Sequence, residues 1–102
     1  MPEEMVRSRL MILVPAYNEA LRLPMFLKNY CAAAAHFSPA MSVSCLVLDD
    51  GSCAEESAAM AASVSKCQLE LKGTEFTVRF VRFEKNRGKG GVLRAGFCQA
   101  LA

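Results

Sequence analysis

The feature that most constrains the fold is a threefold alternation of short apolar runs and helical patterns along the chain. Apolar runs lie at residues 11–14 and 43–48, and segments with helical spacing begin near residues 21, 53 and 92. The third strand is expected at residues 76–83, a β-prone segment whose alternation slips at Val81. A run that is apolar throughout suits a strand buried on both faces of a parallel sheet. Strands joined through helices pair in parallel by right-handed crossovers. The chain is therefore predicted to form a three-layer α/β fold with a three-stranded parallel sheet.

The second helix, expected over residues 53–66, has its own start signal. Ser52 followed by Glu55 matches a capping box, in which the hydroxyl accepts a backbone N–H and the carboxylate reaches back. The alanine-rich sequence offers Ala59, Met60 and Val64 as inward positions. We expect the helix to pack on the sheet through these three side chains.

The composition is that of one small globular domain, residues 1–102. The chain is 53% hydrophobic and 22% charged, and no apolar run reaches the roughly 18–20 residues that cross a bilayer. The acidic start, Met-Pro-Glu-Glu, argues against a secretory leader. Five cysteines without C-x-x-C spacing indicate reduced thiols rather than a disulfide framework or a zinc site. These features predict a soluble, intracellular chain.

Positive charge is concentrated in the C-terminal third. Residues 72–94 contain seven lysines and arginines and two glutamates, a local charge of +5 in a chain of net charge +2. Such a region suits an anionic ligand, and it equally suits a solvated basic face.

The three strand ends carry the most unusual chemistry of the sequence. They are residues 15–19, 49–52 and 86–91. In a parallel sheet, ligands bind beyond the carboxyl ends of the strands, and the topology places these three loops along one edge. That edge is the predicted functional site.

The first two loops offer an aromatic ring and carboxylates. Tyr17 can stack on a base or a sugar, or it can be a tyrosine at the edge of the core. Asp49 and Asp50 are adjacent at a strand end, so their side chains point in opposite directions and are not expected to chelate one metal. One carboxylate suits a base N–H or a ribose hydroxyl while the other holds the loop, and plain helix capping is the simpler alternative.

The third loop, Asn-Arg-Gly-Lys-Gly-Gly at residues 86–91, suits a pyrophosphate. Bare backbone N–H groups, a helix dipole and the Lys89 ammonium group converge there. The loop is not a Walker sequence, because Gly90 follows Gly-Lys, and Leu93 breaks a G-x-G-x-x-G pattern. Together the three loops imply a nucleoside diphosphate ligand.

These motifs resemble the opening of inverting family-two glycosyltransferases. The matching segments are Ile-Leu-Val-Pro-Ala-Tyr-Asn-Glu at 12–19, Leu-Val-Leu-Asp-Asp-Gly-Ser at 46–52 and Asn-Arg-Gly-Lys-Gly-Gly-Val-Leu-Arg-Ala-Gly at 86–96. With Arg-Leu-Pro at 22–24, the pattern is most similar to the dolichyl-phosphate β-glucosyltransferase branch. The resemblance implies a Rossmann-like parallel sheet, the N-terminal half of a GT-A type nucleotide-diphospho-sugar transferase fold.

The resemblance also implies roles for residues of the nucleoside pocket. Pro15 and Tyr17 would line it, with Tyr17 near the base, and Glu19 would contact the nucleotide end of the donor. Leu48 would offer its backbone, and Asp50 its carboxylate, to uracil.

On the phosphate side, the resemblance implies that Lys89 and Arg94 face the diphosphate. Asp49 would organise its loop rather than bind the donor. No catalytic residue is identified among these positions.

The family's metal-binding D-x-D motif is expected just downstream of the last helix, and the chain ends at Ala102 without it. The resemblance therefore implies Mg²⁺ or Mn²⁺ in a complete enzyme, with ligands outside this chain. The acceptor half and the membrane segments are also missing, so we expect an incomplete domain that is inactive alone. It would be either an N-terminal fragment or a truncated product that binds nucleotide poorly.

In the complete enzyme, glucose would pass from UDP-glucose to dolichyl or another polyprenyl phosphate, on the cytosolic side of the endoplasmic reticulum membrane, with no nucleic acid involved. Two alternatives stay open: another family-two enzyme, for example one using GDP-mannose, and a non-catalytic nucleotide-binding or interaction module. Self-association is also expected, through partly exposed Phe76, Phe80, Phe83 and Phe97.

Overall fold

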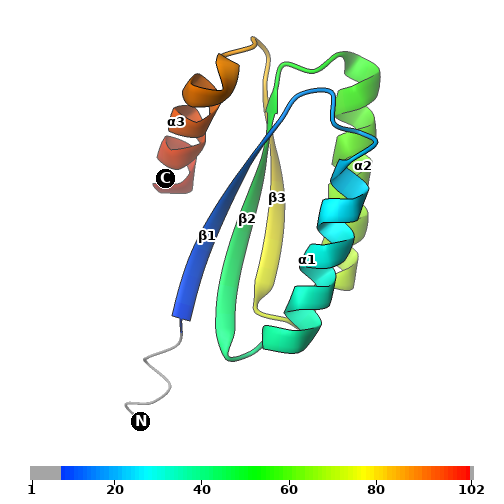
Figure 1. Cartoon of the computed structure of the whole chain (residues 1–102), viewed down its shortest axis with the longest axis vertical. Coiled ribbons are helices and arrows are strands. Elements are labelled where there is room, and N and C mark those ends of the chain that lie inside the picture. The colour runs from blue at the N-terminus through cyan, green and yellow to red at the C-terminus, as the bar shows by residue number, and fades with distance from the viewer. Residues whose placement is uncertain (1–7, 102) are drawn as a thin grey trace.

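The computed structural model describes residues 8–101 as an alternating α/β fold. Its elements are β1 (Ser8–Ala16), α1 (Leu23–Phe37), β2 (Met41–Asp50), α2 (Ala54–Glu70), β3 (Phe76–Phe83) and α3 (Gly88–Leu101). The three strands are parallel in the order β1-β2-β3, with α1 and α2 on one face and α3 on the other (Figure 1). The predicted three-layer, Rossmann-like sheet is confirmed.

The central strand, β2, is apolar because both of its faces are covered. Val43, Cys45 and Val47 belong to the core beneath α1 and α2, whereas Leu46 and Leu48 belong to a second core beneath α3. Successive strand side chains point to opposite faces, so the continuous apolar run supplies both cores at once.

Edge strand β3 resolves an apparent irregularity of the sequence, where alternation seems to slip at Val81. Phe76 and Phe80 pack toward α1 and α2, while Val81 and Phe83 join the core under α3. The strand alternates regularly; its second face becomes apolar where α3 begins to cover it. Phe76 is only 4% exposed, so the expectation that this ring lies partly in solvent was wrong.

Helix α2 buries two of its three predicted inward residues, Met60 and Val64, but lacks the predicted capping box. Its buried row is Ser57, Met60, Val64 and Cys67, whereas Ala59 is exposed. Ala59 lies about 100° around the helix from Met60, and this rotation carries it off the buried stripe. The capping box was also wrong: Cys53 is the N-cap residue, without a side-chain cap bond, and the Ser52 hydroxyl is engaged elsewhere.

Helix α3 lies close to the sheet because a glycine faces it. A Cβ built on Gly96 would stand 2.3 Å from Cδ1 of Leu48, which has no solvent exposure. Val92, one turn earlier, is likewise fully buried. No helix within residues 8–101 is both long enough and apolar enough to span a membrane.

We propose that the α3 face of the chain associates with a second copy. Phe97 on α3 is 58% exposed, and Met11 on edge strand β1 is 45% exposed. Met11 lies on the same face of the strand as Leu13, which packs under α3. Exposed apolar surface of this kind favours association. Light scattering at increasing concentration should show a rising mean mass, reduced in the Phe97→Ser variant. A clean monomer at high concentration would contradict this expectation.

Candidate functional site

The carboxyl ends of the three strands meet at one edge of the sheet. In the parallel register, Ala16 pairs with Asp49, and Asp49 pairs with Arg82. The β1–α1, β2–α2 and β3–α3 loops therefore leave the sheet side by side, at the top of the molecule in Figure 1. This is the edge at which the sequence predicted a site.

The β1–α1 and β2–α2 loops are joined by reciprocal hydrogen bonds. The Asn18 backbone N–H donates to Oγ of Ser52 at 2.8 Å, and the Cys53 N–H donates to Oδ1 of Asn18 at 3.3 Å. The Ala20 N–H donates to Oε1 of Glu56 at 3.0 Å. These bonds connect the β1–α1 loop, which carries Tyr17, to the β2–α2 loop and the start of α2.

Ser52 is a junction of the site that the sequence analysis missed. It is 2% exposed, and its hydroxyl binds the β1–α1 loop. Its backbone N–H donates to Oδ1 of Asp49 at 3.0 Å, and its carbonyl accepts from Nη2 of Arg82 at 3.1 Å. The only sign of this role in the sequence was a serine two residues after the end of β2, and it was interpreted as part of a capping box.

Asp49 organises its loop, in agreement with the role implied for it. Its side chain has no solvent exposure, and Oδ1 accepts the Ser52 N–H. The other oxygen, Oδ2, stands 3.9 Å from Nε of Arg82 and accepts no hydrogen bond from the described residues. The positive charge of Arg82, on edge strand β3, therefore compensates the negative charge of the buried Asp49 carboxylate.

Asp50 and Gly51 bring the second and third loops into contact. Oδ1 of Asp50 accepts the Arg87 backbone N–H at 2.6 Å, and Asp50 is 5% exposed. Gly51 has φ of +79°, and a Cβ at this position would lie 2.8 Å from the backbone nitrogen of Asn86. The Asp-Asp-Gly-Ser and glycine-rich segments therefore touch, with glycine required at the contact.

The glycine-rich loop opens α3 and presents cations to solvent. The Gly88 N–H donates to Oδ1 of Asn86 at 3.0 Å, and the Arg87 guanidinium lies 4.9 Å from the centre of the Phe83 ring. Lys89 is exposed in the first turn, beside backbone N–H groups that a helix start leaves without intrahelical partners. This end of α3 carries the electrostatics of an anion site.

Arg94 lies on a different side of α3 from Lys89. It shares a recess of about 460 Å³ with Arg87 and Phe83. Five residues of helix separate Arg94 from Lys89, a rotation of about 140°. Both side chains are exposed.

The remaining predicted residues lie at or near the end of β1. Tyr17 is 50% exposed, and Pro15 pairs in register with the fully buried Leu48. Glu19 holds Arg22 through two hydrogen bonds, at 2.7 and 2.8 Å. The Tyr17 ring is therefore available to a ligand, whereas the Glu19 carboxylate already has a cationic partner.

These residues do not fit a divalent metal. No group of three potential metal-ligating side chains gathers anywhere within residues 8–101. Asp49 and Asp50 point to opposite faces of the sheet, and Glu19 is paired with Arg22. Asp49, Asp50 and Glu19 therefore do not form a three-ligand metal site within residues 8–101.

Comparison with known proteins shows the family to which this chain belongs. The glycosyl transferase family 2 profile matches residues 11–101, which include all three loops. The chain belongs to glycosyl transferase family 2. Members of this family use a nucleotide-sugar donor and an acceptor. In this chain the three sequence motifs lie in the loops at the carboxyl ends of the strands.

Two curated relatives are similar over most of the chain. Human dolichyl-phosphate beta-glucosyltransferase is 35% identical over 92 residues, which are 87% of this chain and 26% of the human protein. The mouse protein of the same name is 33% identical over 92 residues, with the same coverage. The chain thus spans about a quarter of the length of these relatives. No solved structure matches it.

Proposed function

We propose that this chain is the nucleotide-sugar-binding part of a transferase that moves glucose from UDP-glucose to a polyprenyl phosphate such as dolichyl phosphate, with inversion. The observation that supports this proposal most is the contact among the three loops at the strand ends. The choice of glucose and dolichyl phosphate is supported by the names of the two relatives.

In this proposal the β1–α1 and β2–α2 loops hold the nucleoside. The half-exposed Tyr17 ring stacks on the base, beside Pro15. Asp50 and the Leu48 backbone recognise uracil, and the bond from the Arg87 N–H holds the Asp50 carboxylate in place. Glu19, paired with Arg22, contacts the nucleotide end of the donor.

The diphosphate lies against the start of α3. Lys89 supplies a mobile positive charge, the glycine-rich backbone supplies N–H groups, and Arg94 approaches from the recess that it shares with Arg87. We propose that Mg²⁺ or Mn²⁺ acts in the complete enzyme through residues outside 8–101, where it would stabilise the departing diphosphate.

The acceptor in this proposal needs little activation. A polyprenyl phosphate is already ionised near neutral pH, so its oxygen can attack the anomeric carbon without a strong general base. The residues that orient the acceptor are assigned to other parts of the complete enzyme. We also propose that the complete enzyme acts at the cytosolic face of the endoplasmic reticulum, because its proposed acceptor is dolichyl phosphate.

Calorimetric titration of the chain with UDP, UDP-glucose and GDP-mannose tests this proposal. We expect weak binding of both uridine nucleotides, with little change when Mg²⁺ or Mn²⁺ is added. The reason is that the base-binding and phosphate-binding groups are at the described edge, whereas a metal site is not found among those residues.

Each other outcome of this titration has a definite meaning. Tight and strictly metal-dependent binding would place a metal at Asp49 and Asp50, against the geometry described above. Preference for GDP-mannose would indicate another member of the family. Binding of no nucleotide would favour an interaction module over a donor-binding domain.

A further inference from the structure

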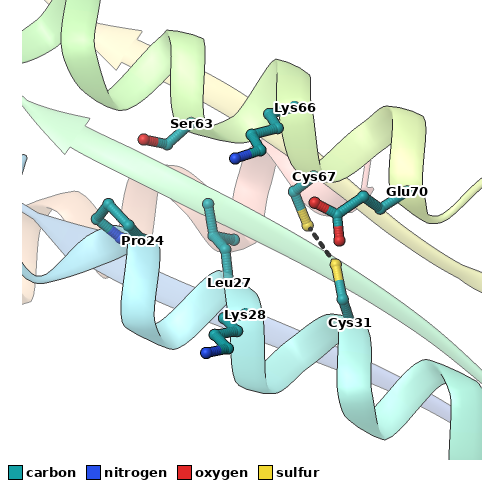
Figure 2. A pocket seen from close by; sticks show the side chains of 8 residues that line it. All are labelled: Pro24, Leu27, Lys28, Cys31, Ser63, Lys66, Cys67 and Glu70. Carbon is teal, nitrogen blue, oxygen red and sulfur yellow. Dashed lines mark hydrogen bonds between the residues drawn. The ribbon is translucent and has the colours of Figure 1, made fainter.

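Two cysteines face each other across the gap between α1 and α2. The Sγ atoms of Cys31 and Cys67 are 3.3 Å apart, and Figure 2 shows the two thiols pointing toward one another from facing helices. A disulfide has an S–S length of about 2.05 Å, so the sulfurs need to approach by roughly 1.2 Å. Cys31 is partly exposed and Cys67 is buried, which makes the two thiols unequal in access.

A cavity opens beside this pair of thiols. It measures about 560 Å³ and is lined by both cysteines together with Lys28, Lys66 and Glu70. This size is in the range of pockets that take small molecules. Figure 2 shows the two lysines on opposite walls, with Lys28 on α1 and Lys66 on α2.

We propose that the α1–α2 groove is a thiol–disulfide exchange site that takes a small anionic disulfide, with Cys31 reacting first and Cys67 resolving the intermediate. Oxidised glutathione has this chemistry, since its carboxylates give it a negative charge that Lys28 and Lys66 attract. The site lies along the helices rather than in the three-loop edge, and it does not depend on nucleotide binding.

The exchange takes place in two balanced steps. The Cys31 thiol loses its proton to solvent, and its sulfur attacks one sulfur of oxidised glutathione; the glutathione S–S bond breaks, and one glutathione leaves and takes up a proton. The Cys67 sulfur, after losing its own proton, then attacks Sγ of Cys31 and expels the second glutathione. Two protein thiols are oxidised to one disulfide, and one oxidised glutathione is reduced to two thiols.

The surroundings of the two thiols make this exchange slow, because the thiolate is the attacking form. Burial raises the pKa of the Cys31 thiol, although its hydrogen bond with Cys67 lowers it, and Glu70 raises it further. Burial raises the pKa of Cys67 to about 12, and Cys31 and Glu70 add to this effect. Both thiols are therefore protonated at neutral pH. An oxidised disulfide pool is needed to drive the exchange.

Oxidation followed by mass spectrometry tests the proposal. The experiment uses the full chain with Cys53→Ser and Cys98→Ser, because these two exposed thiols would also react with the disulfide. After incubation with oxidised glutathione and alkylation, we expect loss of two hydrogens and one peptide pair that joins Cys31 to Cys67. The Cys67→Ser variant should instead stop with one glutathione attached to Cys31, because the resolving thiol is missing.

A charge-reversal variant tests the selectivity of the groove. Lys28→Glu with Lys66→Glu should slow the reaction with oxidised glutathione roughly 3- to 10-fold more than the reaction with neutral hydroxyethyl disulfide. Equal slowing with both reagents would overturn the preference for an anion. Absence of the Cys31–Cys67 link, or persistence of the mixed disulfide when Cys67 is present, would overturn the site.

Discussion

Gly51→Ala should lower the free energy of unfolding of this chain by about 2–4 kcal/mol. Gly51 has φ of +79°, where a side chain is strained, and a Cβ would stand 2.8 Å from the backbone nitrogen of Asn86. Relief requires the β2–α2 and β3–α3 loops to separate, which also pulls Asp50 from the Arg87 N–H. Urea unfolding followed by circular dichroism measures the loss, and UDP affinity should fall with it.

Gly73→Ala is the matched control for this prediction. Gly73 has a similar φ, +84°, but nothing lies within 4 Å of where its Cβ would be. Its substitution should cost only the backbone strain, about 1–2 kcal/mol, and leave UDP binding unchanged. If the two variants lose equal stability, the approach of Gly51 to Asn86 does not hold the loops together.

The order of elements was predictable because each strand has an unambiguous composition. The central run at 43–48 is apolar on both faces, and only a strand between two helical layers needs that pattern. Parallel topology then placed the three loops at one edge without further information. The fold and the neighbourhood of the site therefore follow from local patterns.

The connections within the site were not predictable in the same way. Ser52 sits at a position where a cap is expected, yet its hydroxyl accepts from Asn18, which is 34 residues away. The guanidinium of Arg82 reaches the Ser52 carbonyl from β3, which local sequence cannot indicate. These bonds depend on the register of three strands, and register becomes visible only after the sheet has formed.

The packing of α3 shows the same limit. Gly96 reads in sequence as a weak helix residue, whereas in the structure it faces the fully buried Leu48. The helix approaches the sheet through its smallest side chain, because Leu48 already fills the space between them. Helical spacing alone does not distinguish a close-packed glycine from a flexible one.

Lys89→Ala in a full-length enzyme should weaken donor binding by about 1.5–3 kcal/mol, the scale of a hydrogen bond to a charged group. Lys89 is exposed in the first turn of α3, beside the glycine-rich backbone proposed to receive the diphosphate. Titration should show a larger loss for UDP than for uridine, because only UDP carries the charge that the ammonium group attracts. Lys85→Ala, an exposed cation just before the same loop, should change either affinity little.

Asp50→Asn separates recognition of the base from recognition of the phosphates. Loss of the carboxylate should weaken the binding of uridine and of UDP to the same extent. The carboxylate is proposed to bind uracil and it accepts the Arg87 N–H, and both ligands need these contacts. The two variants thus give different patterns across the same pair of ligands. Only Lys89→Ala distinguishes UDP from uridine, and a general loss of folding could not produce that difference. If Lys89→Ala leaves UDP affinity unchanged, the basic stretch at 79–94 is a solvated face, and the diphosphate does not lie against α3.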